Sequence, residues 1–115
     1  MSTYFYPSAV YGIKISQRLV KEKGLREDDE GRSKIESILE SYNYKLFCRA
    51  GEHSDFTGKD VSLLGVIVAK VDPNEGRDMV EEIYLSKKQE KEIQELLTNF
   101  SDGKKFHYFL VGEWG

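Results

Sequence analysis

The sequence predicts an α+β fold, in which two main helices pack on one face of an antiparallel sheet of four or five strands. Three observations support this prediction: two apolar stripes with helical spacing, several runs with the period of a β-strand, and the order in which these segments follow one another. In each stripe the apolar residues fall at i, i+3, i+4 and i+7, positions that share one face of an α-helix. The stripes are formed by Ile35, Ile38, Leu39 and Tyr42, and by Ile93, Leu96, Leu97 and Phe100.

The beginning of the chain is expected to hold one strand and one short helix. Within residues 3–15, small or polar side chains alternate with aromatic or β-branched ones, as in a strand that is covered on one face. Pro7 has no N–H for a ladder hydrogen bond, so the regular part of this strand is expected to begin near Ala9. Ser16 is a suitable N-cap for a short helical turn that ends before Gly24.

The middle of the chain is expected to hold the first striped helix and two strands. The helix is predicted from about residue 33 to residue 42, with Ser33 as its cap, after a charged surface loop at residues 25–32. Residues 44–50 alternate as a strand does. Residues 61–71 form a β-branched run that is long enough to be the central strand of the sheet.

The last part of the chain contains one ambiguous segment. Residues 72–76 give the clearest turn signal, because proline presets its backbone angle and Asn and Gly tolerate a positive φ. Residues 79–85 fit either a strand or an early start of the second striped helix. We favour the strand, because Ser86 and Gln89 form a capping-box pattern that places the helix start at Ser86. The final strand is predicted at residues 106–111.

The order of these elements narrows the predicted fold. Without the ambiguous strand the order is βαββαβ, which is that of the ferredoxin-like split βαβ sandwich. The two matched stripes agree with the internal pseudo-symmetry of that fold, although any two core-facing helices of similar length produce such a match. At 115 residues the chain has the commonest size of one domain, so residues 1–115 are expected to form a single domain.

Composition and charge exclude several classes of function. The net charge is −3 with 32% charged residues, so no global attraction to nucleic acid or anionic lipid is expected. Cys48 is the single cysteine, which excludes an internal disulfide and a structural thiolate zinc site. With no secretory leader and no apolar run near the roughly 18 residues of a membrane span, a cytoplasmic location is expected.

The segment at residues 51–60 is the main place where chemistry is expected. It contains His53, Asp55 and Lys59, side chain types that serve general acid and base catalysis. Its glycines have the wrong spacing for a P-loop, and an Asp follows the Lys where a Ser or Thr is needed. One His and scattered carboxylates are not a metal motif, so no metal or other cofactor is expected.

Aromatic residues supply the candidate contact surface. Tyr and Trp are over-represented at interface hot spots, and sheet aromatics in some ferredoxin-like domains stack on RNA bases. Together with a basic residue at the sheet and the 51–60 segment, these aromatics give the set of candidate binding residues. The set is Tyr6, Tyr11, Arg49, His53, Asp55, Lys59, Tyr108 and Trp114.

We therefore expect a small cytoplasmic binding or regulatory protein that is not catalytic and acts through protein–protein contact. A homodimer formed through a sheet edge or face is one form of this expectation. Two alternatives stay open: a small enzyme that uses the 51–60 loop, and a protein that binds RNA or single-stranded nucleic acid through sheet aromatics. No catalytic motif in the sequence rises above background, which favours binding over catalysis.

Overall fold

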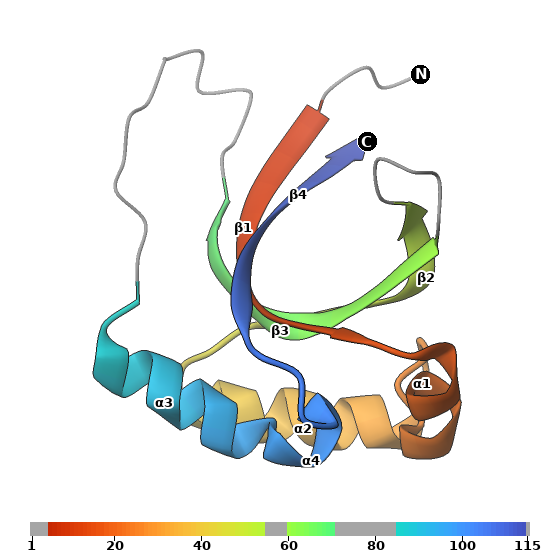
Figure 1. Cartoon of the computed structure of the whole chain (residues 1–115), viewed down its shortest axis with the longest axis horizontal. Coiled ribbons are helices and arrows are strands. Elements are labelled where there is room, and N and C mark those ends of the chain that lie inside the picture. The colour runs from red at the N-terminus through yellow and green to blue at the C-terminus, as the bar shows by residue number, and fades with distance from the viewer. Residues whose placement is uncertain (1–4, 55–59, 71–84, 115) are drawn as a thin grey trace.

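Four strands form one antiparallel sheet in the computed structural model, and the helices lie on one side of it (Figure 1). The structure describes residues 5–54, 60–70 and 85–114. The predicted α+β class is confirmed. In chain order the elements are β1 (Phe5–Ile15), α1 (Gln17–Lys23), α2 (Glu30–Ser41), β2 (Leu46–Ser54), β3 (Asp60–Lys70), α3 (Lys87–Leu96), α4 (Thr98–Ser101) and β4 (His107–Trp114).

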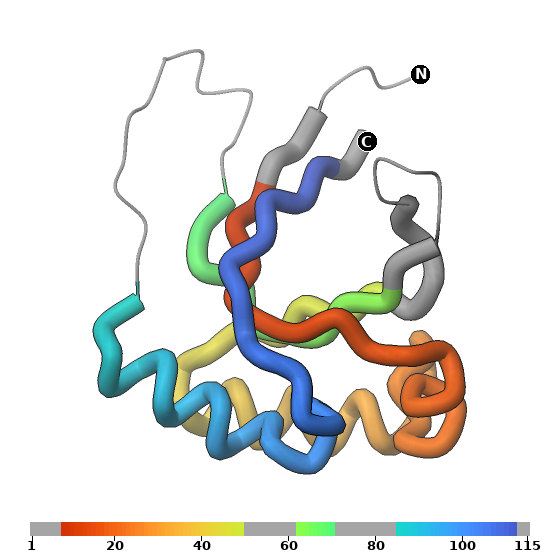
Figure 2. The backbone as a smooth tube through the Cα atoms, in the orientation of Figure 1, coloured from red at the N-terminus to blue at the C-terminus, as the bar shows by residue number. Residues whose placement is uncertain are grey.

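The strand order across the sheet is β2-β3-β1-β4, so β3 and β1 are central and β2 and β4 are the edges. Each neighbouring pair is antiparallel. β1 and β4 run side by side and both turn away from the helices (Figure 2). In the middle of the sheet, one row of paired residues crosses every strand: Phe47, Gly65, Gly12 and His107.

One apolar core joins the helices to the sheet. Its buried side chains come from β1, β2 and β3 on one side and from α1, α2 and α3 with their flanking residues on the other. Burying each large aliphatic side chain stabilises the fold by about 1.5–3 kcal/mol relative to exposing it. The buried members are Tyr11, Ile13, Ile15, Val20, Leu25, Ile35, Leu39, Cys48, Leu64, Val66, Ile93 and Leu97.

Two helices begin at the caps that the sequence predicts. Ser16 precedes α1, where its Oγ accepts a hydrogen bond from the backbone N–H of Leu19 at 3.1 Å. Gly24 ends that helix in the left-handed conformation, with φ 61°. Before α3, Ser86 and Gln89 form the complete capping box, in which each side chain accepts from the backbone N–H of the other.

The predicted start of α2 is wrong. The helix begins at Glu30, and Ser33 lies inside it, with Asp29 at the N-cap position. The carboxylate of Asp29 accepts a hydrogen bond from the N–H of Arg26 at 3.0 Å, which closes the turn before the helix. Glu30 then stands in the first turn, where the helix dipole favours a negative charge. The segment at residues 25–32, predicted as a loop, therefore contains the first residues of α2.

The strand boundaries also differ from prediction. β2 continues to Ser54 and β3 begins at Asp60, so both ends of the expected 51–60 loop are strand. β1 begins at Phe5 rather than near Ala9, and Pro7 pairs with Gly112 of β4. Pro7 precedes the first pair of β1 with β3, so its missing N–H interrupts no ladder between those two strands.

The ambiguous segment at residues 79–85 is largely untested. Residues 79–84 lie outside the described residues, and Leu85 belongs to neither a strand nor a helix.

The two apolar stripes are buried to different degrees. Ile93 and Leu97 are fully buried, whereas Ile38 and Tyr42 are 49% and 48% exposed. Within the three described ranges, no helix combines the length and apolar character needed to cross a membrane.

Candidate functional site

The side of the sheet opposite the helices, here called the helix-free face, carries a second apolar cluster. Val10, Phe47 and Leu63 are buried in it, with exposed fractions of 5% or less. The residues packed around them are half-buried: Ile67, Phe109 and Val111. All members lie in strands, and the register pairs Val10 with Ile67 and with Phe109. The sheet is thus apolar on both faces, although helices cover only one (Figure 1).

Two glycines lie in the same row of the sheet as Phe47. Gly12 and Gly65 stand opposite each other in the central strands, and Phe47 stands opposite Gly65 in β2. Because neither glycine has a side chain, the position next to Phe47 in this row and the one beyond it hold only backbone. A glycine in a strand interior typically marks such a close approach.

Two cationic side chains border the apolar cluster beside Leu63. Lys14 pairs with Leu63 in the sheet, and Arg49 pairs with Leu63 on the other side. The guanidinium carbon of Arg49 lies 4.9 Å from the centroid of the Phe47 ring, within cation–π range, and Nη1 donates to the Cys48 carbonyl at 3.1 Å. His107 contacts the ring of Phe109 edge-on, with centroids 6.3 Å apart.

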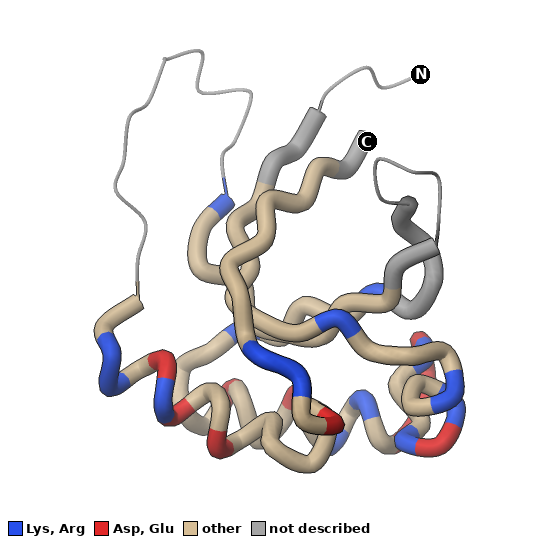
Figure 3. Tube along the Cα trace, viewed as in Figure 1, with Lys and Arg blue, Asp and Glu red and all other residues tan. Residues whose placement is uncertain are grey.

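Charge is distributed unevenly between the two layers (Figure 3). Along the strands, the charged side chains that the structure describes are Lys and Arg, whereas the helices and their loops carry both signs. An apolar surface bordered by Lys and Arg is the arrangement that a partner with apolar groups and carboxylates would complement.

The aromatic residues Tyr11 and Tyr108 lie on the helix-covered face. Tyr11 is 3% exposed, and its hydroxyl accepts a hydrogen bond from Gln94 Nε2 at 2.7 Å. Its ring contacts that of Tyr108, with centroids 4.7 Å apart. The Tyr108 hydroxyl accepts from the N–H of Leu85 at 3.1 Å and donates to Glu90 Oε2 at 3.0 Å. Together these bonds hold α3 and its N-terminal entry against the sheet.

The surroundings of Tyr108 also affect its ionisation. Burial raises the pKa of its hydroxyl most, the N–H of Leu85 lowers it, and the hydrogen bond and charge of Glu90 raise it. The net shift is upward. The hydroxyl therefore keeps its proton and its role as a donor to Glu90.

A second tyrosine bridges sheet and helix in the same way. The Tyr44 hydroxyl donates to Glu92 Oε1 of α3 at 2.7 Å. Burial first, and then the hydrogen bond and charge of Glu92, raise the pKa of Tyr44 to about 12. This residue was not among the predicted site residues, and its contacts are structural.

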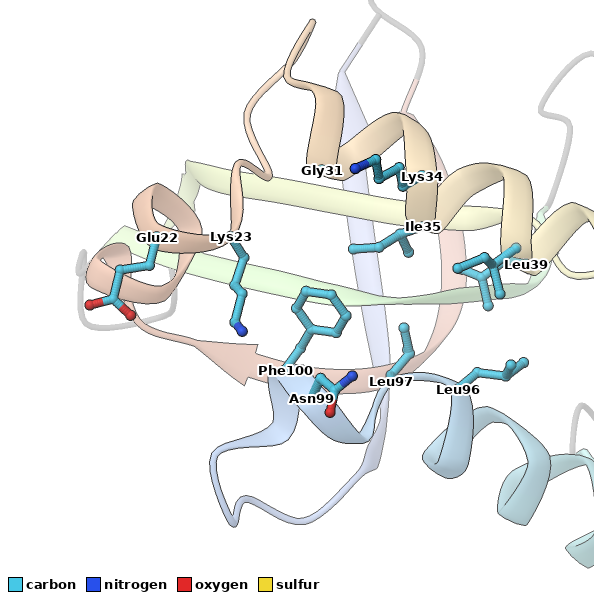
Figure 4. A pocket seen from close by; sticks show the side chains of 11 residues that line it. Glu22, Lys23, Gly31, Lys34, Ile35, Leu39, Leu96, Leu97, Asn99 and Phe100 are labelled. Carbon is cyan, nitrogen blue, oxygen red and sulfur yellow. The ribbon is translucent and has the colours of Figure 1, made fainter.

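An apolar pocket of about 390 Å³ opens in the helix layer between α2 and the end of α3 (Figure 4). Its floor is formed by Ile35, Leu39, Leu97 and Phe100. At its rim, Lys23 Nζ lies 6.0 Å from the Phe100 ring centroid, and Lys34 pairs with Glu30 at 3.7 Å. Both lysines at the rim are thus engaged within the chain.

The remaining predicted site residues are placed only in part. Tyr6 lies in β1 opposite Glu113, His53 in β2 opposite Val61, and Trp114 in β4 opposite Phe5. Asp55 and Lys59 lie outside the described residues. The acid–base hypothesis for the 51–60 segment therefore stays a prediction. Across the residues with known placement, no group of three potential metal-ligating side chains occurs.

The prediction from sequence missed the apolar cluster on the helix-free face. A signal for it was present: in the run that forms β3, consecutive residues are apolar, which is typical of a strand covered on both faces. No protein family, curated protein or solved structure matches the chain in the three comparisons made. The site is therefore interpreted from its own residues.

Proposed function

We propose that the protein is a small, non-catalytic binding or regulatory domain that acts through contact with a protein partner on the helix-free face. The observation that supports this proposal is the apolar cluster on a sheet face that none of α1–α4 covers. Apolar surface is favoured where it meets another apolar surface, because water is released from both.

The residues of this face indicate what kind of partner surface would fit it. Val10, Phe47 and Leu63 form a buried centre, and the half-buried Ile67 and Phe109 pack against it. Protein interfaces commonly have such an apolar centre and a polar rim, with aromatic and Arg side chains enriched. Because Lys14 and Arg49 border the cluster beside Leu63, we propose a partner with an apolar patch bordered by carboxylates.

We also propose the ferredoxin-like split βαβ fold for this chain. The proposal is supported by the strand order β2-β3-β1-β4, by the antiparallel pairing of all neighbours, and by the packing of the helices on one face of the sheet.

A cytoplasmic location is proposed on separate grounds. Cys48 is the single cysteine of the chain and is buried as a thiol, which suits a reducing compartment.

The experiment that tests the binding proposal places a photo-reactive phenylalanine analogue at position 67, where the half-buried Ile67 packs against the apolar cluster of the helix-free face. The matched control places it at position 38, where Ile38 is exposed on the helix layer. After irradiation in native-host extract, cross-linked proteins are identified by mass spectrometry. A partner is expected at position 67 and not at position 38.

The captured protein is then purified and titrated with the wild type, Ile67→Glu and Ile38→Glu by calorimetry. Ile67→Glu is expected to weaken binding at least about tenfold, because it places a charge in an apolar contact and repels the carboxylates of the partner. Ile38→Glu is expected to bind as the wild type does. Equal affinity for all three proteins would contradict the proposed surface.

A second candidate function is binding of single-stranded nucleic acid on the same face. The observation that favours it is the combination of Lys14 and Arg49 with the aromatic rings of Phe47 and Phe109. Bases stack on such rings while cations contact phosphates. Fluorescence anisotropy with labelled oligouridylate and oligothymidylate tests this function. Binding that weakens steeply with added salt would support it, and no binding at low salt would exclude it.

A further inference from the structure

The two edges of the sheet differ in how well they are protected against pairing. The edge strand β2 carries Arg49, follows Lys45, and its register with β3 shifts between Arg49 and His53. Charged residues and irregular register are the features by which sheet edges resist pairing with another chain. At the opposite edge, residues 107–112 of β4 contain no Lys, Arg, Asp, Glu or Pro. The β4 edge is therefore the unprotected one.

The side chains of β4 are also apolar enough to be covered. Leu110 is 82% exposed, the highest exposure among the large apolar residues described. Its neighbours Phe109 and Val111 belong to the apolar cluster of the helix-free face and are only half-buried. A neutral edge strand with an exposed leucine at its centre favours strand addition.

We propose that two copies of this chain pair through β4, antiparallel and with Leu110 at the two-fold axis. In this register Leu110 stands opposite Leu110 of the second copy, and Phe109 stands opposite Val111 of the second copy. Tyr108 stands opposite Gly112, so residues 108–112 pair without opposing charges. Paired residues on one face of such a ladder have Cβ atoms about 4.5–5.5 Å apart, which is van der Waals reach for two leucines.

A second copy fits this edge better than a foreign strand. A two-fold axis makes the strand its own complement, because the exposed apolar side chain of Leu110 then meets an identical apolar side chain while the outward backbone groups of the two copies pair. Residues 108–112 carry no ionisable side chain other than the Tyr108 hydroxyl, which removes the like-charge repulsion that a symmetric pairing of a charged edge creates. This inference concerns the sheet edge and does not depend on the partner proposed for the helix-free face.

The test is the oligomeric state of purified protein, measured by sedimentation equilibrium from micromolar to millimolar concentration. The wild type is expected to form a dimer. Leu110→Lys and Leu110→Glu are each expected to weaken the dimer at least about tenfold, because like charges then stand directly opposite each other. An equimolar mixture of the two variants is expected to restore the dimer, since Lys then faces Glu across the axis.

The matched controls are Ile38→Lys and Ile38→Glu, which place the same charges at an exposed aliphatic position of α2 and are expected to leave the dimer intact. Far-ultraviolet circular dichroism checks that each variant is folded. A wild type that stays monomeric at millimolar concentration would overturn the proposal. Dimers that persist in both Leu110 variants, or a mixture that stays monomeric, would overturn it as well.

A covalent measurement covers the case in which a charged variant fails to fold. Leu110→Cys is a smaller change at an exposed site, and under mild oxidation it is expected to form a disulfide-linked dimer faster than Ile38→Cys does. Cys48 is buried and is not expected to compete. Equal rates of cross-linking at the two positions would contradict pairing at Leu110.

Discussion

Gly12 and Gly65 stand opposite each other in the two central strands, closer than any other residue type would allow. A Cβ added to Gly12 would lie 2.2 Å from the Leu64 carbonyl oxygen, and one added to Gly65 would lie 2.4 Å from the Tyr11 carbonyl oxygen. Both obstructing atoms belong to the backbone, so they cannot rotate away. The pair therefore fixes the spacing of β1 and β3, on which both faces of the sheet depend.

Gly65→Ala is expected to lower the free energy of unfolding by about 3 kcal/mol, the upper end of the roughly 1–3 kcal/mol that overpacking usually costs, because the obstructing atoms are backbone. Urea denaturation measures this loss. The control is Gly103→Ala, at a position with φ 74° and no atom within 4 Å of the added Cβ. Its cost is expected to be about 1 kcal/mol, from the left-handed backbone alone. Equal costs at both positions would contradict the steric explanation.

Ser86→Ala is expected to destabilise the protein by about 1 kcal/mol, because it removes the side chain that caps the first turn of α3. Thermal or urea unfolding measures the change. Ser33→Ala is the comparison, since the Ser33 hydroxyl reaches only the Asp29 carbonyl at 3.4 Å and is exposed. It is expected to change stability by less than about 0.5 kcal/mol. A loss of stability larger than this for Ser33→Ala would indicate that Ser33 caps α2 after all.

Ser62→Ala is expected to leave stability unchanged or to raise it by up to about 1 kcal/mol. Ser62 is 4% exposed in β3, and its Oγ has no hydrogen-bond partner in the described part of the chain. Removing an unsatisfied buried hydroxyl removes the cost of its desolvation. The same substitution at Ser16, whose Oγ caps α1, is expected to destabilise the protein. Opposite signs at the two serines are the result to look for in urea unfolding.

The stability that Tyr44 provides is expected to depend on pH in the alkaline range. Its folded pKa of about 12 lies above the ordinary value of 10.0. Between these two values the unfolded chain loses the proton while the folded chain keeps it, so stability falls as pH rises. Below pH 10 the contribution is fully present.

Comparison with Tyr44→Phe isolates this effect from the other tyrosines. The advantage of the wild type over Tyr44→Phe, measured by urea denaturation, is expected to shrink between pH 10 and pH 12. Glu92→Gln is expected to reduce that pH dependence, because the Glu92 carboxylate contributes to the raised pKa. A difference that stays constant over this range would contradict the role of the Tyr44–Glu92 bond.

Local signals in the sequence predicted the helices better than the faces of the sheet. Ser16 and Ser86 cap α1 and α3 as predicted, because capping depends on residues within one turn. The start of α2 was missed because the turn closed by Asp29 and Arg26 has no comparable pattern. The apolar spacing also does not predict that Ile35 is buried while Ile38 is exposed, since this difference depends on where α2 lies over the sheet.

The candidate site was harder to predict because it depends on pairing between distant strands. Tyr11 and Tyr108 read as exposed anchors in the sequence, yet pairing places both beside α3, where they bind Gln94 and Glu90. Phe47 and Phe109 reach the helix-free face through the same register. Alternation assigns residues to two sides of a strand, but only the packed helices decide which side is covered.

The buried thiol of Cys48 gives the molecule an internal reporter of its own opening. Its Sγ donates to the Leu25 carbonyl at 3.4 Å, at the point where the segment after α1 meets β2. A thiol reagent must wait until this contact separates, so its labelling rate in native buffer measures how often that region of the core opens. If labelling is faster than global unfolding, α1 and the segment after it separate from the sheet while the rest of the fold stays intact. If the two rates are equal, this region opens only when the whole chain unfolds.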